Sequence, residues 1–220
     1  QIRKVNKIGD LVGTQVVTNL SGDQRLRSGP TSANGKVYFA VGFNSSSTLE
    51  LWSSSSDEGS SASKFAACTL CDWNYALVSS GQLFWTRGDN FVRSIDLSSK
   101  EQKNFADVGT GNSALGFTFK EQFLWVVYKE PGLTGESGIK RFDLNGGFLK
   151  DHLAGTREFE GALTHDDSDM FFFVNLGTTT TRRIFKAPVQ DLLANSAGSA
   201  EVYNAGAGPM GSLRSDEDFG

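Results

Sequence analysis

The sequence SALGFTFKEQFLWVV, residues 113–127, contains two strand-like stretches joined by a short polar turn. The same layout recurs in 28–41 (SGPTSANGKVYFAV), 74–87 (NYALVSSGQLFWTR) and 160–174 (EGALTHDDSDMFFFV), and a shorter copy occupies 210–220 (MGSLRSDEDFG). The apolar-aromatic stretches begin 40 to 49 residues apart, at Val37, Leu83, Phe123, Met170 and Phe219. This regular spacing predicts a repeat protein.

Each repeat continues with two more stretches in which apolar and polar residues mostly alternate, which is typical of half-buried strands. The first of these is expected at 49–52, 92–97, 139–144 and 182–186, and the second at 15–18, 64–67, 103–106, 148–151 and 201–203. Together with the strand before each turn, this makes four short antiparallel strands every 40 to 50 residues, the pattern of β-propeller blades. No stretch has a sustained helical period, although 189–194 could form one helical turn.

We therefore predict an all-β fold, a β-propeller of four-stranded antiparallel blades with about five blade equivalents, in a complete ring of five or six blades. A β-sandwich is the alternative, but it does not require the same layout four times over. The whole chain, 1–220, is expected to form one propeller domain and to be a piece of a longer polypeptide. Its expected blade parts are 1–22, 23–71, 72–110, 111–156, 157–208 and 209–220.

Two stretches resemble known propeller repeats. LFWTR at 83–87, followed by VRSIDL at 92–97, resembles the YWTD repeat of low-density-lipoprotein-receptor-type propellers. QIRKVN at 1–6, running into VVTNLSG at 16–22, resembles the end of an NHL repeat. The Asp that closes the YWTD signature is replaced by Val41, Arg87, Val127 and Val174. The resemblance implies an often extracellular, usually six-bladed propeller that binds other proteins.

The composition restricts the partners. The chain of 220 residues carries 21 basic and 25 acidic side chains, for a net charge of −4. Without a dense basic block, neither nucleic acid nor an anionic membrane surface is expected as a partner. No apolar stretch approaches the length of a membrane span.

Few residues are candidates for catalysis or metal binding. Glu160 is the acid expected on an innermost strand, where some propeller lyases and lactonases hold a metal. His165, Asp166 and Asp167 lie in a turn whose carboxylates could hold calcium, but aspartate is also a common turn residue. His152 is expected at a solvated edge. No cofactor is expected, and an enzyme is the less favoured interpretation.

Two weak signals favour a secreted or cell-surface protein. Cys68 and Cys71 are expected to form a local disulfide between two blades, with two free thiols as the alternative. Asn19 and Asn44 begin N-glycosylation acceptor sequences.

The expected binding residues lie in loops at blade tips, which usually carry ligand contacts in rigid scaffolds. Arg87-Gly88-Asp89 resembles an integrin-type adhesion tripeptide, although Gly88-Asp89-Asn90 is also ordinary turn chemistry. The next tip loop contributes Lys129, Glu130 and Glu136, and Trp73 is expected to be exposed. We predict a non-catalytic extracellular module that binds a partner protein, a glycan or a neighbouring domain of the same polypeptide. The alternatives are a propeller-type hydrolase or lyase with a channel metal, and a structural piece of a surface coat or filament.

Overall fold

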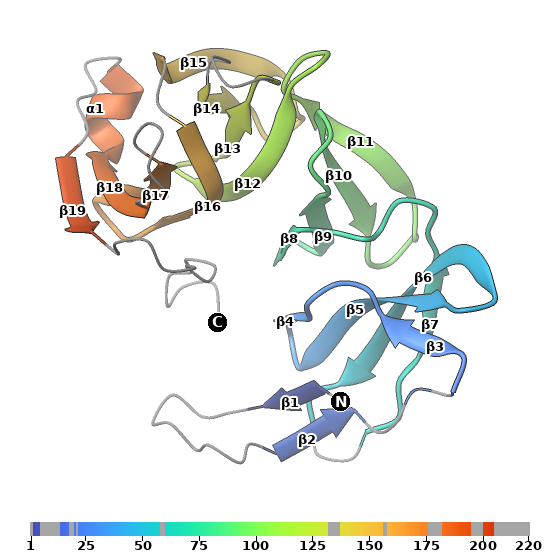
Figure 1. Ribbon diagram of the computed structural model, residues 1–220. Coiled ribbons are helices and arrows are strands. Elements are labelled where there is room, and N and C mark those ends of the chain that lie inside the picture. Colours follow the sequence, from blue (N-terminus) through green and yellow to red (C-terminus); the bar gives the residue numbers. More distant parts are fainter. Residues whose placement is uncertain are drawn as a thin grey trace.

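The computed structural model describes residues 2–4, 14–17, 20, 22–57, 60–131, 137–155, 158–175, 182–194 and 200–204. A two-stranded sheet and four larger antiparallel sheets follow one another along the chain, and the four larger sheets are arranged as an arc around a common centre (Figure 1). The fold is therefore an all-β propeller, as the repeat predicts, and the blades that the structure describes form part of a ring (Figure 1).

The strands that make up the first pair and the first blade are β1 (Ile2–Lys4), β2 (Thr14–Val17), β3 (Gln24–Leu26), β4 (Thr31–Ala33), β5 (Lys36–Phe43), β6 (Ser46–Ser55) and β7 (Ser63–Ala67). The second blade contains β8 (Tyr75–Ser79), β9 (Gln82–Thr86), β10 (Phe91–Asp96) and β11 (Gln102–Asp107). The third contains β12 (Ser113–Lys120), β13 (Phe123–Lys129), β14 (Ser137–Phe142) and β15 (Phe148–Gly155). The fourth contains β16 (Glu158–His165), β17 (Asp169–Asn175), β18 (Arg182–Pro188), the helix α1 (Val189–Ala194) and β19 (Ala200–Asn204).

In the second, third and fourth blades the strands lie side by side in chain order, and each pairs with the next. In the first blade, β5, β6 and β7 follow the same order. The predicted starts of the second strands are correct to within one residue in all four blades. The helical turn expected at 189–194 is α1. The expected strand at Phe219 lies outside the described residues.

The innermost strand of the first blade is interrupted. Both β3 and β4 pair with β5, and the segment Arg27–Pro30 separates them. Pro30 has no N–H to donate to a ladder, which favours a break in the strand at this point. The break leaves Ser28 and Gly29 available to contact the next blade.

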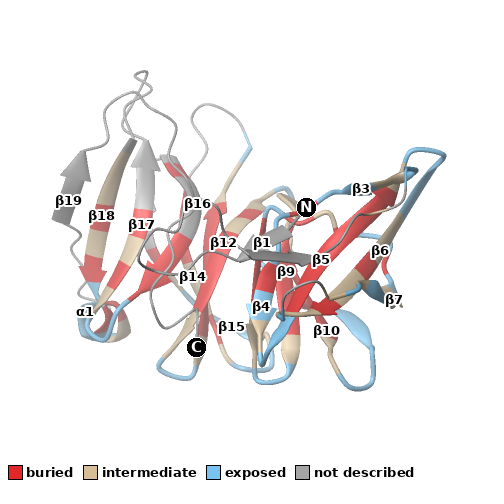
Figure 2. Cartoon of the chain, turned by 90° about the horizontal axis from the view of Figure 1, so that it is seen from below, coloured by how far each residue is buried: buried red, intermediate tan, exposed pale blue. Residues whose placement is uncertain are grey.

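The three larger hydrophobic cores lie between blades. Figure 2 shows the buried residues along the strands of the blades. The side chains of one sheet face pack on the facing side of the next sheet, because successive residues of a strand point to opposite faces. The core between the first and second blades runs from Tyr38 to Ile95, the next from Tyr75 to Phe142, and the third from Trp125 to Leu192 of α1. Each of these three cores is thus shared by two consecutive blades, whereas a smaller cluster of Val37, Phe39 and Val41 lies on the other face of the first blade.

The first hairpin of three blades has a two-residue turn with both residues at positive φ, the geometry of a type I′ turn. These pairs are Asn34-Gly35, Ser80-Gly81 and Glu121-Gln122. Only the third pair lacks glycine, although Gln122 has a φ of 62°.

We expect Gln122→Gly to stabilise the protein by about 0.5–1 kcal/mol, because glycine adopts positive φ without the steric cost of a side chain. Chemical denaturation measures the free energy of unfolding. The matched control is Gly81→Gln, at a φ of 74° with no atom within 4 Å of an added Cβ, which should destabilise by a similar amount. Equal stability of all three proteins would contradict the prediction.

The third turn of the second and third blades, at the same end of the sheet as the first hairpin turn, uses aspartate. The Asp96 carboxylate accepts hydrogen bonds from the N–H groups of Ser98 and Ser99, and the Asp143 carboxylate accepts them from Asn145 and Gly147. The second of these turns packs closely on the preceding blade. Gly146, at a φ of 86°, lies against β11, where an added Cβ would be 1.7 Å from the carbonyl oxygen of Phe105.

In the part of the chain that the structure describes, no helix is long and apolar enough to cross a membrane.

Candidate interaction surface

The tip loop Arg87–Asn90 joins β9 to β10 and is held by both its own blade and the next one. The carbonyl oxygen of Asp89 accepts a hydrogen bond from the N–H of Ala114 in β12 (2.7 Å), and that of Asn90 accepts one from Val108 (2.9 Å). The side chain of Asn90 donates to the carboxylate of Asp107 (2.8 Å). One backbone bond to the next blade and one to the end of its own blade therefore hold this loop in place.

The Asp89 carboxylate forms a two-point ion pair with a buried arginine. Both terminal nitrogens of Arg93 donate to it, at 2.8 and 2.7 Å, and the N–H of Phe91 donates a third hydrogen bond. The Arg93 side chain is only 8% exposed, whereas that of Asp89 is 36% exposed. Burial opposes ionisation of Asp89, but these hydrogen bonds and the charges of Arg93 and Arg87 outweigh it and hold the pKa of Asp89 below its usual value.

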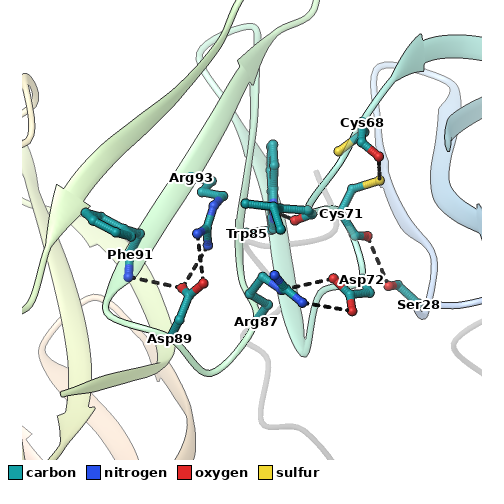
Figure 3. A network of polar contacts seen from close by, with 10 residues as sticks. Ser28, Cys68, Cys71, Asp72, Trp85, Arg87, Asp89, Phe91 and Arg93 are labelled. Carbon is teal, nitrogen blue, oxygen red and sulfur yellow. Dashed lines mark hydrogen bonds and ion pairs between the residues drawn. The ribbon is translucent and has the colours of Figure 1, made fainter. Parts of the chain in front are cut away.

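Arg87 pairs with a carboxylate as well. Its Nε lies 3.0 Å from Asp72, in the connector between β7 and β8 (Figure 3). Both charged side chains of the Arg87-Gly88-Asp89 tripeptide are thus engaged within the chain. This geometry favours a structural role for the tripeptide, and its use in adhesion remains a prediction.

The connector 68–73 joins the first two blades through hydrogen bonds that involve three side chains. Ser28 donates to the carbonyl oxygen of Cys71 (3.3 Å), and the indole of Trp85 donates to that of Leu70 (2.7 Å; Figure 3). The indole of Trp73 donates to the carbonyl oxygen of Gly29 (2.8 Å). The expectation that Trp73 is exposed is wrong: it is 6% exposed, because its ring fills the core between these blades.

The expected disulfide is not formed. Cys68 and Cys71 are free and buried, and the thiol of Cys71 donates to the carbonyl oxygen of Cys68 at 3.7 Å. A hydrogen bond from Cys71 lowers the pKa of the Cys68 thiol, while the same bond and burial raise the pKa of Cys71. The hydrogen bonds of the connector hold the two blades together in place of a covalent link.

The remaining tip residues lie at the same end of the propeller. Lys129 ends β13 and pairs with Ser113, next to the residue whose N–H binds Asp89. Glu130 follows it, and Glu136 lies outside the described residues. Asn44 is exposed in the β5–β6 turn, while Asn19 lies outside the described residues.

The candidate metal ligands are mostly engaged in the β16–β17 turn. The Asp166 carboxylate accepts hydrogen bonds from the N–H groups of Ser168 and Asp169, which lower the pKa of Asp166. Asp167 faces Lys120 at 3.9 Å, and Nδ1 of His165 lies 3.3 Å from the carbonyl oxygen of Asp166. Glu160 lies in β16, with its side chain outside the described part. Among the described residues, no three His, Cys, Asp or Glu side chains gather as a metal site.

His152, expected at a solvated edge, is only 5% exposed. Burial and the charges of Arg141 and Lys150 lower the pKa of His152 to about 4. In the unfolded chain, histidine titrates near pH 6.5. Between about pH 4 and pH 6.5, His152 is therefore protonated in the unfolded state and neutral in the folded state.

We therefore expect the free energy of unfolding to fall as the pH drops from about 6.5 to about 4, by about 2 kcal/mol from this group. Denaturation at several pH values measures this loss, with His152→Gln as the control that removes the titrating group. The difference in slope between the two proteins isolates His152 from the carboxylates. Identical pH profiles would contradict the prediction.

Sequence reasoning missed Arg93, Asp72 and Ser28. Arg93 occupies a polar position of an alternating strand, and its spacing of four residues from Asp89 across a hairpin tip was the available signal. Asp72 and Ser28 act across blades, between residues 15 and 43 positions apart, and no local pattern indicates such contacts.

Comparisons with known proteins support the fold class. No family model matches the chain, and no curated protein is similar to it. Among solved structures, prolyl oligopeptidase B from Galerina marginata shares 15% identity over 87% of this chain, with a TM-score of 0.59. A puromycin-hydrolyzing peptidase from Mycobacterium tuberculosis shares 12% identity over 83% of this chain, with a TM-score of 0.58.

The chain spans only 28% and 31% of the lengths of these two peptidases. At such low identity the likeness shows the propeller fold alone. It supports neither the NHL nor the YWTD repeat in particular.

Proposed function

We propose that the chain is a non-catalytic propeller module that binds a partner protein, a glycan or a neighbouring domain of its own polypeptide. The observation that carries this proposal is that the Arg87–Asn90 loop is held in a fixed position at one end of the propeller. Hydrogen bonds and ion pairs within the second blade, to the connector before it and to the next blade hold the Arg87–Asn90 loop in place. A surface that is ordered before binding loses little conformational entropy when a partner docks.

The proposed binding surface consists of the tip residues Arg87, Asn90, Lys129 and Glu130. Asp89 is left out, because its carboxylate stabilises Arg93.

We also propose an extracellular or cell-surface location, supported by the exposed Asn44 in its acceptor sequence. An intact mass of the native protein that falls on deglycosylation would support this location, and an unmodified mass would count against it.

The test uses two sets of alanine substitutions in the complete chain. The first set changes Arg87, Asn90, Lys129 and Glu130. The matched control set changes residues of similar charge in turns at the opposite end, namely Lys100, Glu101 and Asn145. Capture from the native source, followed by quantitative mass spectrometry, should recover the same partner with the wild type and the control set. Partner recovery that survives the first set would exclude this surface.

A second function is favoured by the comparisons. The similar structures are peptidases in which the matched part covers less than a third of the chain. The chain could accordingly be the propeller part of a larger hydrolase, with or without a channel metal at Glu160 and His165. Metal analysis and hydrolase assays of the native protein, with Glu160→Gln as the variant, test this alternative. A metal-dependent activity that Glu160→Gln abolishes would replace the non-catalytic proposal.

A further inference from the structure

Basic side chains gather on the face of the third blade that packs against the fourth. Trp125, Arg141 and Lys150 are direct partners across β13, β14 and β15, so they project from the same face of the sheet. His152 lies two residues beyond Lys150 on the same face. The core on this face extends to α1, which lies on the same side of the molecule as β14 and β15 (Figure 1).

Arg141 is held by aromatic rings and has no anionic partner among the described residues. Its guanidinium carbon lies 5.0 Å from the ring centre of Phe123 and 5.5 Å from that of Trp125. Its Nε is buried without a hydrogen-bond partner in the described part of the chain. Stacking on rings leaves the edge of a guanidinium free to bind an oxyanion through two parallel N–H groups.

His152 offers a second unsatisfied group at the same place. Its ring lies 5.3 Å from that of Trp125, and its Nε2 is buried with no hydrogen-bond partner among the described residues. Unpaired buried polar atoms are rare in native proteins and often mark a site for water or an ion.

Among the side chains that the structure describes, no carboxylate forms an ion pair with Arg141 or Lys150. The nearest acid along the strand, Asp151, projects from the opposite face and lies 3.7 Å from Lys140. Arg141 and the exposed Lys150 therefore present two positive charges beside a buried histidine. Two positive charges match a phosphate group, which carries a charge of about −1.5 to −2 at pH 7.

We propose that Arg141, Lys150 and His152 form a binding site for a phosphate group, either as the free ion or as a phosphomonoester. Arg141 binds two phosphate oxygens, His152 contributes a hydrogen bond through Nε2, and Lys150 adds charge at the solvent side. The site is separate from the loop surface around Arg87.

The test follows the His152 ring signals by NMR while inorganic phosphate is titrated into the full chain at constant ionic strength. The wild type should show a saturable shift. Arg141→Gln should weaken binding by about tenfold or more, because it removes a charge-assisted pair of hydrogen bonds. Lys150→Gln changes an exposed side chain that the fold does not need, and it should weaken binding by about threefold, as expected for an exposed charge. Lys36→Gln, at an exposed lysine of the first blade, is the matched control and should bind as the wild type does.

A second titration with phosphoserine distinguishes the sources of the phosphate group. Affinity equal to or above that for inorganic phosphate indicates a phosphorylated ligand, and binding of the inorganic ion alone indicates a site for free phosphate. Both results support the site. It is overturned if neither compound gives a saturable shift, or if Lys150→Gln and Lys36→Gln bind phosphate equally well.

Discussion

Gly146→Ala is expected to destabilise the protein by about 4 kcal/mol or more, the largest effect of any substitution considered for this chain. The added Cβ would lie 1.7 Å from the carbonyl oxygen of Phe105 and 2.8 Å from its carbonyl carbon. Both atoms belong to the backbone of β11, so no side chain can rotate away. The β14–β15 turn must move, and it then loses its contact with the second blade.

Gly111→Ala is the control that distinguishes the steric clash at Gly146 from the cost of placing a side chain at positive φ. Gly111 has a φ of 87°, nearly the same as the 86° of Gly146, but no atom lies within 4 Å of its added Cβ. Only the conformational cost of about 1 kcal/mol should remain there. Denaturation of both variants measures the difference. Similar losses at the two positions would show that the turn does not pack on β11 as described.

Asp89→Ala is expected to cost about 3 kcal/mol, because it leaves the Arg93 guanidinium buried without its counterion. The value is at the low end for a broken buried pair, since the Asp89 side chain is 36% exposed. Asp72→Ala is the matched control. It breaks the Arg87–Asp72 pair, whose side chains are 29% and 40% exposed, and should cost less than about 1 kcal/mol.

The double variant Asp89→Ala/Arg93→Met completes the test. Removing the buried charge together with its partner should restore part of the stability lost in Asp89→Ala, since an apolar side chain replaces an unpaired ion. A double variant less stable than Asp89→Ala would contradict this account of the pair. If integrin-type adhesion also survived Asp89→Ala, the tripeptide would not be its cause.

The strands were predictable because their signals are local. Alternation and turn residues place the strand starts at Val37, Leu83 and Met170, each one residue from the observed start, and Phe123 is the observed start itself. The four-strand order of each blade follows, because short turns can only join neighbouring antiparallel strands.

The candidate site was less predictable because it depends on contacts between blades. Trp73 looks exposed in its local sequence, but its indole bonds to Gly29, 44 residues away. Cys68 and Cys71 have a spacing that suits a disulfide or a pair of thiols, and only the packing of the connector distinguishes the two. Arg141 occupies a polar position in an alternating strand, and its aromatic neighbours become evident only once β13 and β14 are paired.

The three cores between consecutive blades also affect how the chain can fold as it is synthesised. The last buried residue of the first core is Ile95, that of the second is Phe142 and that of the third is Leu192. Each new blade of about 50 residues can therefore dock on a surface that has already formed, without waiting for a distant segment. Vectorial synthesis would build such a protein one interface at a time, and each added blade would cover the apolar face left by the one before.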